Sequence, residues 1–126
     1  MNTENASNPK YTTVNLDYLR LRTKNNLALM KEMITIYLQQ TPPLLAAMKE
    51  SSKAANWQGV YAAVHKIIPS FSMMGFDKKY EELAIQIQTH TREEIKTDEL
   101  PNMIIQIDTV CNAGFVELEE ELGRLS

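Results

Sequence analysis

Apolar residues recur along most of the chain at steps of three and four, which is the spacing of amphipathic α-helices. A short helix comes first, capped by Asn15 and carrying Leu16 and Leu19. A long helix follows, and its inward positions are Leu27, Met30, Ile34, Tyr37, Leu38, Thr41, Leu45, Met48 and Ala55. Pro42 and Pro43 interrupt this helix without changing its phase, so the pattern predicts one kinked helix or two nearly collinear helices.

Three more helices follow, each preceded by a residue suited to begin it. Asn56 precedes a helix that ends at Gly75, with an apolar stripe formed by Val60, Val64, Ile67, Phe71 and Met74. Asp77 precedes a helix that is expected to bury Tyr80, Leu83, Ala84 and Ile87. Asp98 is expected to cap the last helix and to place Pro101 at its third position. The inward positions of that helix are Met103, Ile107, Val110, Gly114, Leu118, Leu122 and Leu125.

Four long amphipathic helices with short connections predict an all-α fold, an antiparallel up-and-down four-helix bundle with a short extra N-terminal helix. The length of 126 residues suits one domain. Residues 1–12 are polar and are expected to be a disordered leader, and residues 13–126 are expected to be the bundle. The chain lacks an apolar run of the roughly 20 residues that span a membrane, and it begins without a signal segment, so a cytoplasmic protein is expected.

Composition and motifs exclude most kinds of catalytic chemistry. The net charge of −3 and the pI near 5.4 give no overall basic field for nucleic acid. A single cysteine, Cys111, leaves no intramolecular disulfide or cysteine-rich zinc site, and the sequence contains no glycine-rich phosphate loop, GxSxG or HExxH. Neither histidine has a second ligand at helical spacing, so no metal site is expected. These absences favour an interaction module over an enzyme.

His65 holds the most informative position in the sequence. With the apolar stripe of its helix taken as zero, a turn of about 100° per residue places His65 roughly 140° from the core. Tyr61, Ile68, Pro69 and Ser72 surround it on the outer face. Indifferent surfaces rarely gather isoleucine and proline, so the pattern predicts an exposed imidazole on a docking ridge. Such an imidazole can accept and return a phosphoryl group when a partner supplies Mg²⁺ and a carboxylate.

The stretch AVHKIIPSFSMMG, residues 63–75, resembles the signature of histidine-phosphotransfer (HPt) domains of bacterial two-component phosphorelays. The matches are His65, Ile67 at +2, Ser70 at +5 and Gly75 at +10. The leading short helix, the proline in the long helix and the pair Asn56–Trp57 are also similar to the family, and the resemblance covers about residues 14–125.

The resemblance implies that His65 is the phosphoacceptor of a phosphocarrier without catalytic activity of its own. It implies a response-regulator receiver domain or a hybrid sensor histidine kinase as partner, and no nucleic acid or membrane. It further implies a monomer with no cofactor, because the Mg²⁺ belongs to the receiver. The expected docking or phosphate-proximal residues are Tyr61, Lys66, Ile68, Pro69, Ser72 and Gly75.

Three positions depart from the family pattern. Ile68 stands where the family has lysine, Pro69 where it has glycine, and Phe71 where it has a small residue. Proline has no N–H for the His65 carbonyl, so the helix is expected to kink or end just past His65, leaving it near exposed carbonyls. A positive charge near the phosphoryl group would then come from Lys66, Lys78 or Lys79.

Two alternatives remain open at this stage. One is a degenerate HPt-like module that docks a receiver or kinase without phosphotransfer, and the other is a helical adaptor unrelated to phosphorelay.

The other residues that stand out in the sequence are expected to have structural roles. His90 is expected to be a surface or half-buried structural residue, Cys111 an inert core thiol, Trp57 a packing anchor and the methionines core filler. The acids expected to form a solvated face are Glu117, Glu119, Glu120 and Glu121.

Overall fold

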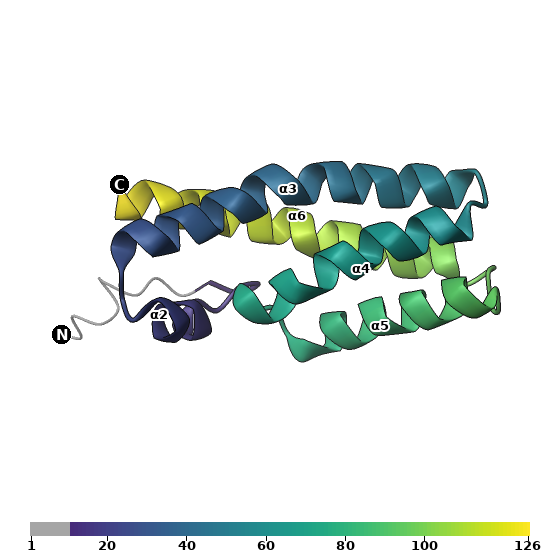
Figure 1. Ribbon diagram of the computed structural model, residues 1–126, viewed down its shortest axis with the longest axis horizontal. Helices are drawn as coiled ribbons and strands as arrows, with labels where there is room; N and C mark the ends of the chain where they lie inside the picture. Colours follow the sequence, from purple (N-terminus) through teal and green to yellow (C-terminus); the bar gives the residue numbers. More distant parts are fainter. Residues whose placement is uncertain (1–10) are drawn as a thin grey trace.

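The computed structural model describes residues 11–126, which form five helices. Their bounds are α2 Asp17–Thr23, α3 Leu27–Lys53, α4 Trp57–Met73, α5 Lys78–Glu93 and α6 Leu100–Leu125. The four long helices run antiparallel in succession, and α2 lies at one end beside the start of α3 (Figure 1). The expected all-α bundle with a short leading helix is therefore confirmed. Within residues 11–126 no helix is long and apolar enough to cross a membrane.

The long helix α3 is one continuous helix despite its two prolines. Pro42 and Pro43 are both exposed, so their rings displace no core side chain. The helix begins where the Asn26 side chain accepts a hydrogen bond from the backbone N–H of Leu29 at 3.0 Å. The prediction of inward positions is wrong at both ends of α3. Leu27 is exposed in the first turn, and Ala55 lies beyond the helix end with a φ of 53°.

Helix α4 begins as expected, with the Asn56 side chain accepting from the backbone N–H of Gly59 at 3.1 Å. Pro69 does not end it, because the helix continues to Met73. It stops at Gly75, whose φ of 68° suits glycine. The Phe76 N–H then donates to the Phe71 carbonyl at 2.9 Å, the hydrogen bond of a Schellman motif.

Helix α5 also has its expected cap, because the Asp77 side chain accepts from the Lys79 N–H at 2.9 Å. The expected cap of α6 is wrong by one residue. Its N-cap is Glu99, without a side-chain capping hydrogen bond, so Pro101 is the second helical residue rather than the third. Five residues expected to be inward are only half-buried against the core: Leu38, Tyr80, Leu83, Leu122 and Leu125.

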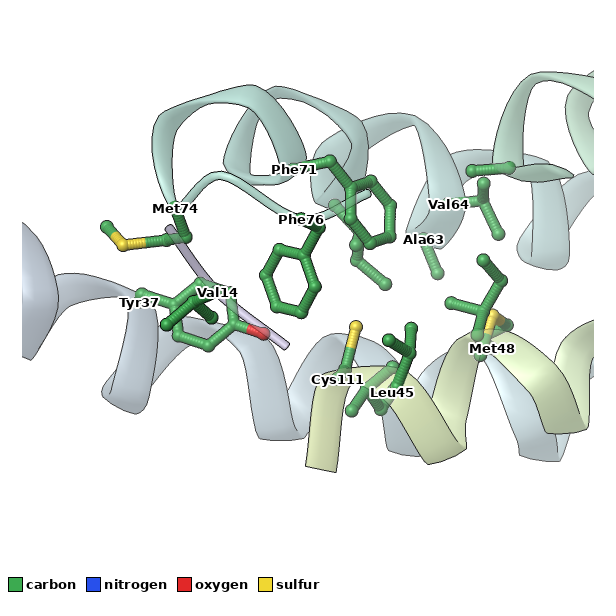
Figure 2. Close-up of a cluster of buried hydrophobic side chains, with 14 of the residues drawn as sticks. Val14, Tyr37, Leu45, Met48, Ala63, Val64, Phe71, Met74, Phe76 and Cys111 are labelled. Atoms are coloured by element: carbon green, nitrogen blue, oxygen red, sulfur yellow. The ribbon is translucent and has the colours of Figure 1, made fainter. Parts of the chain in front are cut away.

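The core is aromatic at the end of the bundle where α2 lies. Phe71 meets Phe76 edge-on with ring centroids 5.3 Å apart, and Tyr37 lies 6.1 Å from Phe76 (Figure 2). Cys111 is fully buried beside them, and burial raises the pKa of its thiol to about 12. The expectation of a core thiol is confirmed. Four methionines are buried in the core as expected: Met30, Met48, Met74 and Met103.

The chain before α2 is fastened to α6 by acidic side chains. The carboxylate of Glu117 accepts hydrogen bonds from the backbone N–H groups of Thr12, Thr13 and Val14 at 3.1, 3.1 and 2.9 Å. Thr12 belongs to the predicted leader, and these hydrogen bonds hold it against α6. Residues 1–10 of that leader lie outside the described residues.

Glu121 is the most unexpected residue in the bundle, because it is fully buried. Its carboxylate accepts from the Tyr11 hydroxyl at 2.9 Å and from Arg124 at 2.6 Å, and it lies 3.6 Å from Arg20 of α2. The expectation of a solvated acidic face is therefore wrong for Glu121. The carboxylate tolerates burial because two guanidinium groups and a hydroxyl replace water around it.

Candidate functional site

His65 lies in the middle of α4, with its side chain exposed as the helical phase predicted. The helix continues for eight residues beyond it. Pro69 therefore does not end the helix beside His65, although the His65 carbonyl lacks the backbone donor that proline removes. Flanking residues Ile67 and Phe71 are fully buried, and this packing holds α4 helical through the proline.

A hydrogen bond from the neighbouring helix fixes the imidazole of His65. Its Nδ1 lies 2.8 Å from Oε1 of Gln88 on α5. An amide oxygen can only accept, so Nδ1 carries the proton and Nε2 keeps its lone pair. The ring of Tyr61, one turn earlier on α4, is nearly parallel to the imidazole at 6°, with centroids 5.9 Å apart. The two contacts set both the tautomer and the orientation of His65.

Two hollows lie along α4, and residues within one turn of His65 line each of them. The larger, about 660 Å³, lies between the start of α4 and the end of α5, and its lining includes Trp57, Tyr61, Thr91 and Arg92. The smaller, about 230 Å³, lies between α3 and α4, and its lining includes Met33, Lys66, Pro69 and Met73. Tyr61 links the first hollow to His65, and Lys66 and Pro69 link the second. Trp57 is half-buried and packs against the core at the helix start, in agreement with a packing anchor.

The other predicted docking residues differ in their exposure and in their distance from His65. Ile68 is half-buried against the core, and Ser72 is exposed two turns from His65. Gly75 lies ten residues from His65, roughly 15 Å along the helix direction, and it terminates α4. A Cβ at Gly75 would overlap the backbone oxygen of Asn15, so its conformation and position already require glycine.

The three lysines that could supply a positive charge to the phosphoryl group also lie at different distances from His65. Lys66 is exposed beside His65 but points about 100° around the helix from it. Lys78 and Lys79 begin α5, roughly 15 Å along that helix from Gln88. The ammonium group of Lys79 lies 5.2 Å from the ring centre of Tyr80. The two lysines of α5 therefore do not surround His65.

Sequence reasoning missed Gln88 and Arg92, both on α5. They are 23 and 27 residues from His65 and match no motif, so only the pairing of α4 with α5 brings them to the site. His90, on the same helix, is half-buried, and its Nδ1 has no hydrogen-bond partner among residues 11–126. The described residues contain no group of three His, Cys, Asp or Glu side chains arranged to hold a metal ion.

Comparison with known proteins identifies the fold. No family model matches the chain, and no curated protein sequence is similar enough to match it. The crystal structure of histidine-containing phosphotransfer protein B (HptB) from Pseudomonas aeruginosa PAO1 is similar, with a TM-score of 0.77 at 13% sequence identity. The similarity covers 91% of this chain and 98% of that one. The chain therefore has the fold of a histidine-containing phosphotransfer protein.

Proposed function

We propose that this protein relays a phosphoryl group to or from the aspartate of a response-regulator receiver domain through His65. The hydrogen bond between His65 Nδ1 and Gln88 Oε1 carries the proposal, because it directs the lone pair of Nε2 outward from an exposed helix face. The fold of HptB supports it further. The receiver belongs to a response regulator or a hybrid sensor histidine kinase.

The transfer requires only one nucleophilic nitrogen from this chain. The Nε2 lone pair attacks the phosphorus of the aspartyl phosphate, the Nε2–P bond forms, and the P–O bond to the aspartate breaks. The aspartate leaves as a carboxylate, and the imidazole ring becomes a cation that keeps its proton on Nδ1. The Gln88 oxygen then accepts a charge-assisted hydrogen bond, which stabilises the phosphorylated state. The reverse step uses the same atoms.

The remaining groups belong to the partner. The receiver supplies the carboxylates and the Mg²⁺ that neutralise the transferred group, so this chain is a phosphocarrier rather than an enzyme. The residues around His65 dock the receiver and exclude water, chiefly the half-buried Tyr61 and the exposed Lys66 and Pro69. In this role the protein acts as a monomer in the cytoplasm and binds neither nucleic acid nor membrane.

The test is phosphoryl transfer from a panel of phosphorylated receiver domains of the same organism. The wild-type protein, His65→Gln and His90→Gln are compared, because His90 is the only other histidine in the sequence. Label on the wild type and His90→Gln but not on His65→Gln, stable in base and lost in acid, is the expected result. Binding of a receiver without label, unchanged in His65→Gln, would instead establish a degenerate docking module.

A further inference from the structure

Arg92 lies one helical turn after Gln88 on α5, so both side chains leave the same face of that helix. A helical side chain leans toward the N-terminus of its helix and covers the turn before its own Cα. For Arg92 that turn carries Gln88, whose oxygen holds the imidazole of His65. Arg92 thus lies one helical turn from the residue that holds the phosphoacceptor, within reach of a group carried on His65.

The larger hollow gives the same placement from a second direction. Arg92 lines this hollow together with Tyr61, and Tyr61 is also the ring that lies parallel to His65. The hollow is on the Gln88 side of α4, opposite to the side that Lys66 and Pro69 share with α3. The hollow that Tyr61 shares with Arg92 therefore brings a cation of α5 to the ring that lies parallel to the imidazole.

Arg92 is also free to change partner. Its side chain is 59% exposed, and its ion pair with Glu93 is long, at 3.8 Å, with Glu93 itself 52% exposed. Exposed pairs of this kind contribute little to stability, so a phosphoryl group with nearly two negative charges competes easily for the guanidinium. Ile68, one turn after His65 on α4, offers no charge at all.

We infer that Arg92 binds the phosphoryl group carried by His65, and that α5 supplies the cation that Ile68 does not. The inference rests on the proposed function. The planar guanidinium donates two parallel N–H groups to two phosphoryl oxygens, a geometry that a lysine ammonium does not reproduce. Arg92 thereby stabilises both the transferring group and the phosphorylated histidine.

A small phosphoryl donor tests this without any receiver. Phosphoramidate transfers its phosphoryl group to Nε2: the Nε2–P bond forms, the P–N bond of phosphoramidate breaks, and ammonia leaves. The wild type is compared with Arg92→Gln, Arg92→Lys and the control Arg22→Gln, an exposed arginine of α2. Labelling rates are measured, and the phosphohistidine is titrated by phosphorus NMR, with circular dichroism to verify folding.

We expect Arg92→Gln to slow labelling about tenfold and to raise the pKa of the bound phosphoryl group, because a nearby cation favours its dianion. Arg92→Lys should recover part of both effects, and Arg22→Gln should behave as the wild type. Equal rates and equal phosphoryl titrations in Arg92→Gln and the wild type would overturn the inference, even if receivers transfer label normally. Label from phosphoramidate but from no receiver would contradict the proposed function alone.

Discussion

Replacing Gln88 with methionine tests how the site prepares His65. The Gln88→Met variant keeps the length of the side chain but removes the oxygen that accepts from Nδ1 at 2.8 Å. A neutral hydrogen bond contributes about 1 kcal/mol net, and exposure of His65 places this one at the lower end of the range. Without this hydrogen bond the imidazole can rotate and can carry its proton on either nitrogen. A smaller fraction of the molecules then has an unprotonated Nε2 facing outward, and the labelling rate should fall roughly threefold.

The equilibrium should change more than this one hydrogen bond suggests. Phosphorylation makes the ring cationic, and hydrogen bonds from charged donors are about twice as strong as neutral ones. The variant therefore loses about 1 kcal/mol more in the phosphorylated state than in the free state. The equilibrium constant should shift toward the receiver by roughly fivefold, since 1.4 kcal/mol is tenfold.

Both quantities come from one experiment that follows label between a receiver and this protein over time. Nitrogen NMR of the His65 ring reports the tautomer directly. The matched control is Gln86→Met, an exposed glutamine of α5 that lines a different hollow with Tyr80 and Gln106. The reasoning would be refuted if Gln88→Met kept the wild-type rate and equilibrium while the NMR showed a changed tautomer.

Four further predictions concern the stability of the bundle. Pro69→Ala restores a donor for the His65 carbonyl and should raise the free energy of unfolding by up to about 3 kcal/mol in urea. Gly75→Ala should lower it by about 2 kcal/mol or more, through the positive φ and the overlap with Asn15; Gly123→Ala, where a Cβ meets nothing, is its control. Glu121→Leu removes the carboxylate that Tyr11 and Arg20 share, and thermal unfolding should show a loss of about 3 kcal/mol; an unchanged midpoint would contradict this. Burial raises the pKa of the Cys111 thiol from its ordinary 9.0 to about 12 in the folded protein, which favours the folded state below pH 9. Stability should therefore decline from pH 9 toward pH 12, less steeply in Cys111→Ala.

The sequence was sufficient for the helices because their signals are local. Periodic apolar positions, Asn56 and Asp77 as caps, and Gly75 as a stop each act within one helix, and the structure has all of them. The exposed position of His65 followed from the same periodicity. The helix break expected at Pro69 does not occur, because the packing of buried residues on either side outweighs the low helix propensity of proline.

Contacts between helices were beyond what periodicity can predict. Glu121 lies on the inward face of α6, and its partners Tyr11 and Arg20 are about 100 residues away in the chain. Gln88 lies 23 residues from His65, and nothing in its own sequence surroundings marks it. A polar residue at a half-buried helical position acquires a role only from the side chain opposite it, which requires knowledge of the packing.

The site draws its chemistry from the pairing of α4 with α5 rather than from α4 alone. Helix α4 presents the nucleophile and the parallel ring of Tyr61, while α5 holds Nδ1 through Gln88 and brings Arg92 to the adjoining hollow. The unusual residues of the motif, Ile68 and Pro69, follow His65 on α4, where they add bulk and remove charge. If the cation sits on α5, neither residue deprives the phosphoryl group of a partner. An uncharged turn after His65 is then compatible with phosphotransfer, because the neighbouring helix α5 supplies the positive charge.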